Sequence, residues 1–402
     1  MTNPRGRTTT NTYDPAGRLS RVTDPYGKYV EMTYDAAGEV TSVRNPRGHS
    51  TATTYDALGD ALTRTDPLGR TTTSTYDLTG RRLTQTDAKT QTQTSCYAAG
   101  GQLLSIGSGS CATGTPYVTL AYDGANRQTS MADATGTTGW TYDGAGNVLT
   151  TNGPQGTITY TYDAAGRRAT MALPGSGTVT YGYDAASQLT SVKDWQNRTT
   201  AFTYAPFGPL DTVVRPNGTS TNYDYDAGGR LGLVEHAKGA AMLARYLYTV
   251  DADGNRTGLT ISGTAVAGGT ETYAYDDLDR LTTWTTTVGG SGSASYAYDE
   301  NGNRTSVTSG GATTTYTVDA ADQLTDLRDG SGTVVQSFAH DANGNRIGST
   351  VGGATDAYGY DWRDRMTSAT VSGTTVTYTY AGDDRRATRT AGGSTTGFVG
   401  RL

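Results

Sequence analysis

Residues 55–76 read YDALGDALTRTDPLGRTTTSTY, which is one complete unit of a phrase that fills the chain. Asp66-Pro67-Leu68-Gly69 has the residues of a tight turn: an Asp that can bond the backbone, a Pro that presets φ, and a Gly at the fourth position. Asp56-Ala57-Leu58-Gly59 repeats this pattern without the proline. The segments between the turns are rich in Thr and Tyr, which favour a pleated, half-buried surface. Each unit is therefore predicted to be a β-hairpin.

The unit recurs with a period of about 20 to 21 residues from Tyr13 almost to the end of the chain. The Tyr, Asp and Gly of each copy are interpreted as structural residues of the repeat, with the clearest copies at Tyr13, Asp14, Gly17, Tyr34, Asp35, Gly38, Tyr55, Asp56, Gly59, Tyr76, Asp77, Gly80, Tyr162, Asp163 and Gly166. With degenerate copies, about eighteen units fill the chain, and so short a fixed period predicts a repeat array. We expect one continuous array over residues 1–402, without a separate N-terminal, core-associated or toxin domain.

Aromatic residues lie two apart just before the Asp in many copies, as at Tyr160 and Tyr162. Residues two apart on a strand share a face, so these pairs are predicted to stack into aromatic ladders. Leucines are expected to form a second row, with the members Leu19, Leu62, Leu83, Leu189, Leu231, Leu281 and Leu324.

The predicted fold class is all-β: a repeat array of β-hairpins that forms one long, curled antiparallel sheet. About 36 strands spaced by about 4.8 Å give a ribbon about 170 Å long, roughly one turn of a shell wide enough for a folded domain. The chain alone is therefore not expected to enclose a polypeptide. A β-propeller is the competing architecture, but about eighteen units would require about nine blades, more than propellers usually have.

Composition fits a thin sheet better than a deep core. Of the 402 residues, 34% are hydrophobic and 54 are Gly, and the mean hydropathy is −0.53. Disorder is the competing interpretation, but the strict period and the 28 Tyr argue against it. A net charge of −6 with no basic stripe disfavours nucleic acid as a partner. No apolar run is long enough for a membrane helix, so membrane insertion is not expected.

The phrase resembles the RHS repeat, also called the YD repeat, most clearly at residues 162–167 (YDAAGR), 66–70 (DPLGR) and 341–346 (DANGNR). The resemblance covers nearly the whole chain. It implies a β-ribbon that spirals into a hollow shell, around a C-terminal toxic polypeptide in bacterial RHS proteins and insecticidal toxin complexes, and as an adhesion scaffold in teneurins.

The resemblance implies a structural, non-enzymatic segment of shell wall in a secreted or surface-exposed bacterial protein, acting in toxin delivery or interbacterial competition. The alternative is an adhesion ribbon that binds carbohydrate or a cell surface. The expected partners are the rest of a larger RHS polypeptide or its toxin payload, or a cell-surface glycan under the alternative. The array begins in mid-phrase at Asn3-Pro4-Arg5-Gly6, and no segment with the Asp-Pro-x-Gly-Leu hallmark precedes the last residues, 397–402. The chain is therefore interpreted as a fragment.

Candidate reactive groups are few. His49, His236 and His340 lie in different units without a nucleophile pattern, so no catalytic site is predicted. His340 takes the Tyr position of its repeat, and residues 235–239 are expected to form an exposed loop with Lys238 and Gly239 at the tip of an extended hairpin.

The Asp- and Asn-rich segments 251–255, 299–303 and 341–345 resemble calcium loops but lack the EF-hand register, so no metal or other cofactor is expected. Cys96 and Cys111 are the only cysteines and flank an expanded unit, which is consistent with a disulfide; free thiols in a reducing compartment are the alternative.

Overall fold

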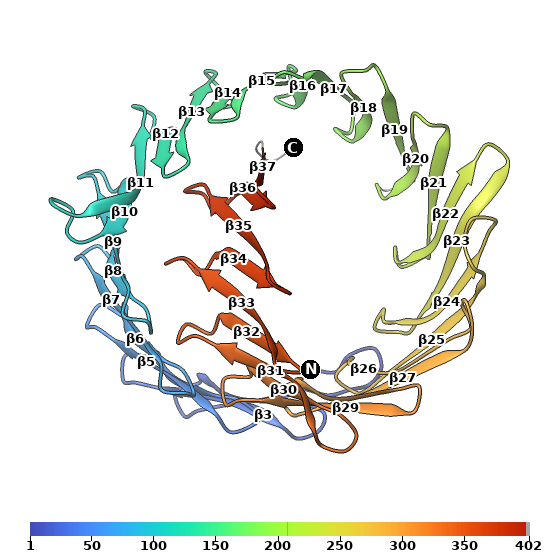
Figure 1. Ribbon diagram of the computed structural model, residues 1–402, viewed down its shortest axis with the longest axis horizontal. Coiled ribbons are helices and arrows are strands. Elements are labelled where there is room, and N and C mark those ends of the chain that lie inside the picture. The colour runs from blue at the N-terminus through green and yellow to red at the C-terminus, as the bar shows by residue number, and fades with distance from the viewer. Residues whose placement is uncertain (207, 399–402) are drawn as a thin grey trace.

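A computed structural model describes residues 1–206 and 208–398, so residues 399–402 of the terminal segment lie outside the described part of the chain. One antiparallel sheet of 37 strands contains all the described strands, and each strand pairs with the next one along the chain (Figure 1). The predicted fold class is confirmed, and the continuous sheet excludes separate propeller blades. Over the described residues, no helix has the length and apolar character needed to span a bilayer.

The strands are β1 (Thr10–Tyr13), β2 (Leu19–Thr23), β3 (Tyr29–Tyr34), β4 (Val40–Arg44), β5 (Ser50–Tyr55), β6 (Ala61–Thr65), β7 (Thr71–Tyr76), β8 (Arg82–Thr86), β9 (Thr92–Tyr97), β10 (Leu103–Ser108), β11 (Thr115–Tyr122), β12 (Gln128–Asp133), β13 (Gly136–Tyr142), β14 (Val148–Gly153), β15 (Gly156–Tyr162), β16 (Arg168–Leu173), β17 (Gly177–Tyr183), β18 (Leu189–Lys193), β19 (Thr199–Tyr204), β20 (Leu210–Val214), β21 (Thr219–Tyr225), β22 (Leu231–Lys238), β23 (Ala241–Val250), β24 (Arg256–Ser262), β25 (Gly269–Tyr275), β26 (Leu281–Thr286), β27 (Gly292–Tyr298), β28 (Arg304–Ser309), β29 (Ala312–Val318), β30 (Leu324–Arg328), β31 (Val334–His340), β32 (Arg346–Val351), β33 (Ala354–Tyr360), β34 (Met366–Val371), β35 (Thr374–Tyr380), β36 (Arg386–Ala391) and β37 (Ser394–Gly397).

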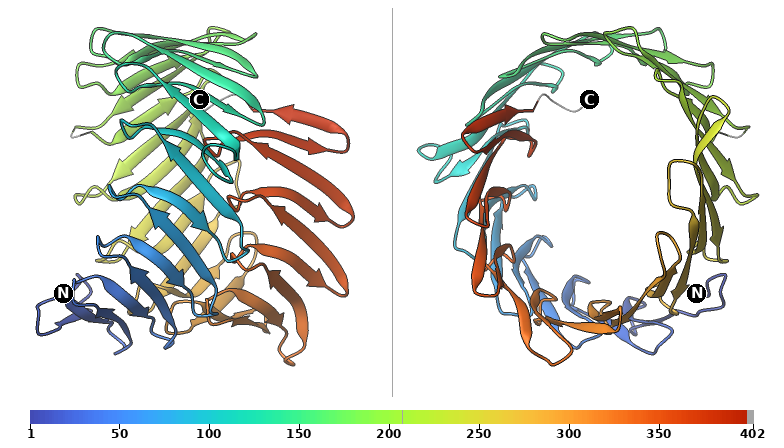
Figure 2. Two further views of the ribbon diagram at one scale, coloured as in Figure 1. Left: turned by 90° about the vertical axis from the view of Figure 1, so that its left-hand side faces the viewer. Right: turned by 45° about the vertical axis from the view of Figure 1, so that its right-hand side comes forward.

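The ribbon curls into a spiral that overlaps itself. In Figure 2 the blue strands near the N-terminus lie beside the orange and red strands near the C-terminus. Hydrogen bonds join these turns of the spiral at separations of 249 to 275 residues. One turn of the spiral thus takes fewer residues than the chain contains, so the expectation of roughly a single turn was wrong: the ribbon completes one turn and begins a second.

The Tyr-Asp turn has the chemistry predicted for it. In the unit after β15, Asp163 Oδ1 accepts hydrogen bonds from the amides of Ala165 (2.9 Å) and Arg167 (3.0 Å), and the Gly166 amide donates to the Asp163 carbonyl (3.0 Å). Gly166 has a φ of +77°, in the left-handed region that Gly adopts most easily and β-branched residues do not. The side chain and backbone of Asp163 therefore define the turn together.

Most repeat Tyr residues sit at a β-bulge and reach back to the preceding hairpin. The register of β15 against β16 shifts between Thr161 and Tyr162, and the Tyr162 hydroxyl donates to the Val148 carbonyl at 2.8 Å. The acceptor is the carbonyl of the residue that pairs with the Tyr of the preceding repeat, or with the residue that replaces that Tyr. The same contact recurs at Tyr34, Tyr55, Tyr76, Tyr97, Tyr142, Tyr183, Tyr204, Tyr225, Tyr275, Tyr298, Tyr360 and Tyr380. The Tyr hydroxyls thus join neighbouring hairpins, a role that the predicted packing rows did not include.

The two faces of the sheet differ in chemistry. Tyr160 is buried with Ile158, Met171 and Val179, whereas Thr161, on the opposite face, is exposed and hydrogen-bonds the Thr170 hydroxyl at 2.6 Å. Apolar burial is confined to small clusters of this kind, consistent with the low hydrophobic content. Hydrogen bonds and ion pairs along the ribbon therefore carry much of the stabilisation.

The predicted aromatic ladders are wrong in detail, because Arg side chains separate the rings. Among the described residues, the ring pairs in contact are Tyr117 with Trp362 and His236 with Tyr246. Guanidinium groups lie over many of the other rings instead, as Arg168 does over Tyr160 with 4.8 Å to the ring centroid. Such cation–π contacts contribute about 0.5 to 2 kcal/mol each, depending on desolvation.

The predicted Leu row is only partly in register. Leu19, Leu189, Leu231, Leu281 and Leu324 pair directly with the Tyr or Val that precedes their turn. Leu62 and Leu83 lie one residue later, because Ala61 and Arg82 pair with the Tyr and the bulge skips the next position.

Gly166→Val places a β-branched residue at positive φ and should destabilise its turn by about 1 to 3 kcal/mol. Space is not the obstacle, since a Cβ added at this position would meet no other atom within 4 Å. In a repeat array each unit contacts mainly its neighbours, so hydrogen exchange should rise only in hairpins next to residues 163–166.

The matched control is Gly166→Asn, because Asn126 adopts a φ of +62° in an equivalent turn. This variant should exchange like the parent chain. Uniform loss of protection along the whole chain in Gly166→Val would contradict the local account.

Candidate functional site

The contact between successive turns of the spiral, here called the seam, is the candidate functional site. On one side are the loops at residues 3–6, 24–27, 45–48, 66–69 and 87–90, here called the distal loops. On the other side are the Tyr-Asp turns between β23 and β34. The distal loops and the Tyr-Asp turns lie at opposite edges of the ribbon. Coiling therefore brings the distal-loop edge of the first turn of the spiral against the Tyr-Asp edge of the second (Figure 2).

Arg47 gives the clearest view of the seam. Its Nη1 atom lies 2.6 Å from Asp322 Oδ1 and 2.9 Å from the Asp319 carbonyl, and its Nε lies 3.3 Å from Asp299 Oδ2. One guanidinium therefore bridges two consecutive Tyr-Asp loops that belong to the second turn of the spiral. The Arg47 side chain is only 18% exposed, so water screens these contacts less than it screens a surface pair.

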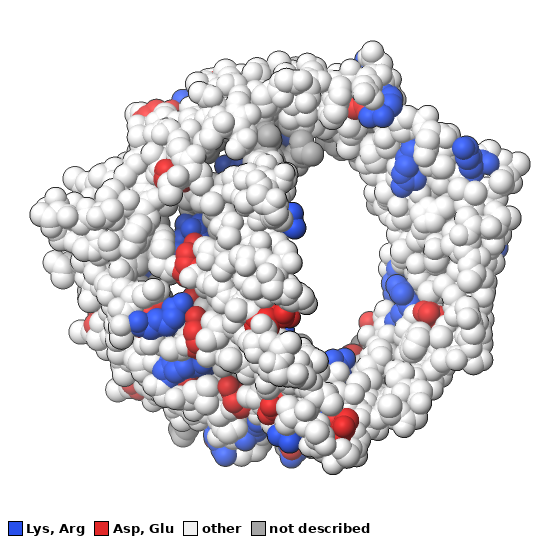
Figure 3. Space-filling view, in the orientation of Figure 1, with Lys and Arg blue, Asp and Glu red and all other residues white. Residues whose placement is uncertain are grey.

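Hydrogen bonds from uncharged donors lie between the ion pairs of the seam. The Asp277 amide donates to the Tyr26 hydroxyl at 3.0 Å, and Asn343 Nδ2 donates to Asp87 Oδ2 at 2.7 Å. Figure 3 shows positive and negative side chains intermingled over the part of the ring where the two turns overlap. Both edges of the ribbon therefore contribute complementary groups.

The last part of the seam is apolar. Tyr117 stacks on Trp362 with ring centroids 4.6 Å apart, and Val118 and Met131 pack against Ala381. A Cβ at Gly382 would lie 2.9 Å from Met131 Sδ, so this close approach requires Gly. Beyond it, β13–β15 and β34–β36 border a cavity of about 860 Å³.

Within one turn of the spiral, a chain of contacts also links each hairpin to the next. Arg167 Nε donates to Asp163 Oδ2 (2.7 Å), Arg167 Nη1 donates to the Asp184 carbonyl (2.8 Å), and the guanidinium lies over the Tyr183 ring (4.8 Å). Sequence reasoning missed this role, although an Arg follows the repeat Gly in many copies. The turn-spanning ion pair recurs at Arg18, Arg81, Arg127, Arg230, Arg280 and Arg365.

These contacts stabilise the ionised form of the turn aspartates. The Arg167 amide and then its guanidinium lower the pKa of Asp163, and the same groups of Arg230 lower the pKa of Asp226. At Asp322 burial opposes ionisation, but hydrogen bonds from Arg47, Asn303 and Asn301 outweigh it and lower the pKa.

The three histidines lie in separate repeat units. His340 lies at the bulge position of β31 that Tyr occupies elsewhere, and burial lowers its pKa. His49 directly follows the distal loop at residues 45–48. His236 lies inside β22 rather than in an exposed loop, and its Nδ1 lies 2.9 Å from the Oγ1 of fully buried Thr221.

The longer unit does form an extended hairpin. Strand β22 ends at Lys238 and β23 begins at Ala241, so Gly239 lies at the tip as expected, together with Ala240, whereas Lys238 is the last residue of the strand. The expectation of an exposed loop fails for Glu235 and His236, because they pair in register with Asn222 and Thr221.

The Asp- and Asn-rich segments use their oxygens within the turn. Asp251 Oδ1 accepts the amides of Asp253 and Asn255, and Asp251 Oδ2 accepts from Asn255 Nδ2. Segments 299–303 and 341–345 repeat this arrangement. The described residues contain no group of three or more His, Cys, Asp or Glu side chains positioned to hold a metal.

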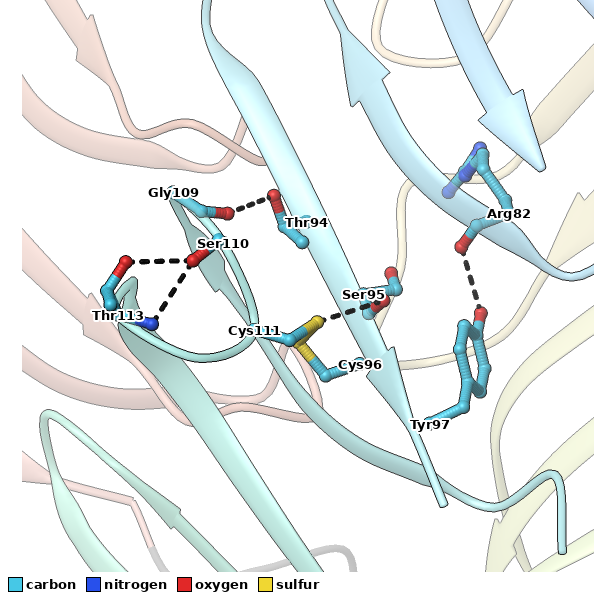
Figure 4. Close-up of a disulfide and its surroundings, with 9 residues drawn as sticks. All are labelled: Arg82, Thr94, Ser95, Cys96, Tyr97, Gly109, Ser110, Cys111 and Thr113. Carbon is cyan, nitrogen blue, oxygen red and sulfur yellow. Dashed lines mark hydrogen bonds between the residues drawn. A yellow bond between two sulfur atoms is a disulfide. The ribbon is translucent and has the colours of Figure 1, made fainter. Parts of the chain in front are cut away.

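Cys96 and Cys111 form a disulfide in the structure, with Cα atoms 5.6 Å apart (Figure 4). The bridge ties β9 to the expanded loop after β10, where Thr94 Oγ1 also donates to the Gly109 carbonyl at 2.6 Å. Closing a loop of 15 residues contributes about 3 kcal/mol in the chain-entropy model.

Acid should destabilise the array. Because the folded-state pKa values of Asp163 and Asp226 are lowered, their contribution to stability is complete above the unfolded pKa of about 3.9 and is lost as the pH falls through the folded values. The urea midpoint, followed by circular dichroism, should decline slightly between about pH 7 and 5, where the lowered pKa of His340 lets the unfolded chain bind a proton first, and should fall more steeply below about pH 4. A midpoint unchanged at pH 3 would contradict this coupling.

We expect no free thiol in the chain purified without reductant. Intact mass after alkylation should show no adduct before reduction and adducts at both Cys96 and Cys111 after it. Two alkylated thiols before reduction would refute the bridge in solution.

Comparisons with known proteins identify the repeat. The teneurin YD-shell model matches residues 63–208, 111–242 and 260–399, and the RHS repeat model matches residues 1–29 and 34–63. No curated protein matches the chain significantly.

Solved structures share the fold. The Photorhabdus luminescens Tc holotoxin pore (mutation TccC3-D651A) and TcdB2-TccC3 each match with a TM-score of 0.68 and 18% identity, over 96% of this chain. The chain spans 26% of each of those structures. With family models covering most of its length, the chain belongs to the RHS/YD-repeat family.

Proposed function

We propose that the chain forms part of the wall of a hollow shell in a bacterial RHS protein that delivers a toxin or acts in interbacterial competition, outside the cell or on its surface. The observation that carries this proposal is the seam. Two turns of one ribbon meet edge to edge through ion pairs, hydrogen bonds and apolar contacts, and the space-filling view shows an open centre (Figure 3). Such a ribbon can form a continuous wall around another molecule.

The proposed partners are the remaining parts of a larger RHS polypeptide and the payload that it carries. The solved structures of similar fold support this direction, since they include a Tc holotoxin pore and TcdB2-TccC3, in one case together with Cdc42. The matched regions of this chain are shell repeats, and two of the candidate reactive groups are engaged in structural contacts, Cys96 with Cys111 and His236 with Thr221. The chain is therefore assigned a mechanical role, enclosure.

Observations on the Tyr faces do not favour the adhesion ribbon. Carbohydrate binding would need exposed ring faces, but guanidinium groups lie over many rings, as Arg18 does over Tyr34 at 4.5 Å from the ring centroid. The Tyr34 hydroxyl is also engaged by the Leu19 carbonyl. Rings used in this way are poor platforms for a sugar.

The test begins with the DNA that encodes the chain and its flanks. The full reading frame should yield a particle in which a polypeptide segment outside residues 1–402 resists limited proteolysis, and the same segment should be digested after denaturation in urea. Mass spectrometry of the fragments identifies it.

Cleavage of the enclosed segment in the native particle would contradict the proposal. If every segment outside the wall is cleaved in the native particle, the enclosing role is wrong. Tyr13 is 60% exposed. Glycan-array binding by the chain that is lost in Tyr13→Ala would instead establish the adhesion ribbon.

A further inference from the structure

The distal loops in the polar part of the seam alternate in charge. Their third residues are, in chain order, Arg5, Tyr26, Arg47, Leu68 and Lys89. The cations thus recur at every second repeat unit, and neutral side chains lie between them. The three cationic side chains are 17%, 18% and 21% exposed, which shows that each is inserted into the seam rather than extended into water.

The Tyr-Asp turns on the other side alternate in the same way. The fourth turn position, normally Gly, is occupied by Gly254, Asp279, Gly302, Asp322, Gly344 and Asp364. The three aspartates adopt φ values of 60°, 61° and 58°, in the left-handed region that Asp tolerates but Gly adopts more easily. The local turn therefore gives no reason to prefer Asp at these positions.

Each of these aspartates faces a cation from the preceding turn of the spiral. Arg5 Nη1 lies 2.6 Å from Asp279 Oδ1, and Lys89 Nζ lies 3.6 Å from Asp364 Oδ1. The Arg47 contact with Asp322, at 2.6 Å, lies between them.

Each cation also contacts the capping aspartate of the preceding Tyr-Asp turn: Arg5 with Asp251 at 3.6 Å, Arg47 with Asp299 at 3.3 Å and Lys89 with Asp341 at 3.0 Å. All three cations therefore bridge two Tyr-Asp turns in the same manner.

Amide groups of the same ribbon complete the surroundings of the aspartates. Asn301 and Asn303 donate to Asp322, and Asn255 donates to Asp279. A fourth aspartate at this position, Asp384, pairs instead with arginines of its own turn of the spiral and lies beyond the distal loops with cations.

We propose that this alternation is a register code, in which Arg5–Asp279, Arg47–Asp322 and Lys89–Asp364 fix how successive turns of the shell align. A slip by one unit would place every cation opposite Gly and every such Asp opposite Tyr or Leu. Each cation would then keep only a capping aspartate, and each fourth-position aspartate would lose its cation. Leaving partly buried charges without these partners is costly. The inference goes beyond the proposed function, since it concerns how the wall closes and not what it encloses.

The register can be read directly with a zero-length cross-link. Lys28 Nζ lies 3.2 Å from Glu300 Oε1 across the seam, and both side chains are exposed enough to react, at 49% and 41%. Carbodiimide coupling of the 402-residue chain should join Lys28 to Glu300, and peptide mass spectrometry gives the yield. Neither residue belongs to the proposed code.

Arg47→Glu and Asp322→Arg should each lower the Lys28–Glu300 yield several-fold, and the double variant should restore it. Arg198→Glu is the matched control, because Arg198 pairs with Asp194 inside its own loop, away from the seam contacts. This control should cross-link like the parent chain.

Asp322→Gly separates the code from general destabilisation. It relieves the positive φ of the turn, so circular dichroism should show an intact fold, yet the yield should still fall. Parent-like yields in Asp322→Gly and both charge reversals, or a double variant no better than the single ones, would overturn the proposal.

Discussion

The aspartate of the Tyr-Asp turn is the group on which the rest of the ribbon depends. Asp163 holds its own turn through backbone amides and also orients Arg167, which binds the next turn and covers the next Tyr ring. The hydroxyl of that Tyr, Tyr183, returns to the carbonyl of Arg168. A sheet with small apolar clusters has little hydrophobic burial to stabilise it, so a polar chain of contacts from hairpin to hairpin takes over part of that role.

Coiling adds a second level of organisation. The ribbon curls until its two edges meet, at separations of 249 to 275 residues. Those edges are built from different turns, one carrying Arg47 or its equivalents and the other carrying extra aspartates such as Asp322. The same repeat therefore supplies both the sheet and the side chains that join its edges at the seam, and a shell wall requires both.

Local features were predictable from the sequence, and long-range ones were not. The hairpins, the turn positions and the roles of Asp163 and Gly166 follow from residue type and spacing, because each is settled within a few residues. The bulge that displaces Leu62 shifts register by one residue, which spacing alone does not reveal. The seam joins loops hundreds of residues apart and depends on curvature, so the alternating charges become meaningful only once their partners are known.

Cryo-electron microscopy of the purified 402-residue chain tests the central claim most directly. The account predicts one ribbon that completes a turn and overlaps itself, with density for the loop at residues 45–48 against the turns at 299–302 and 319–322. An open ribbon whose edges never meet, or a closed ring of separate blades, would contradict it.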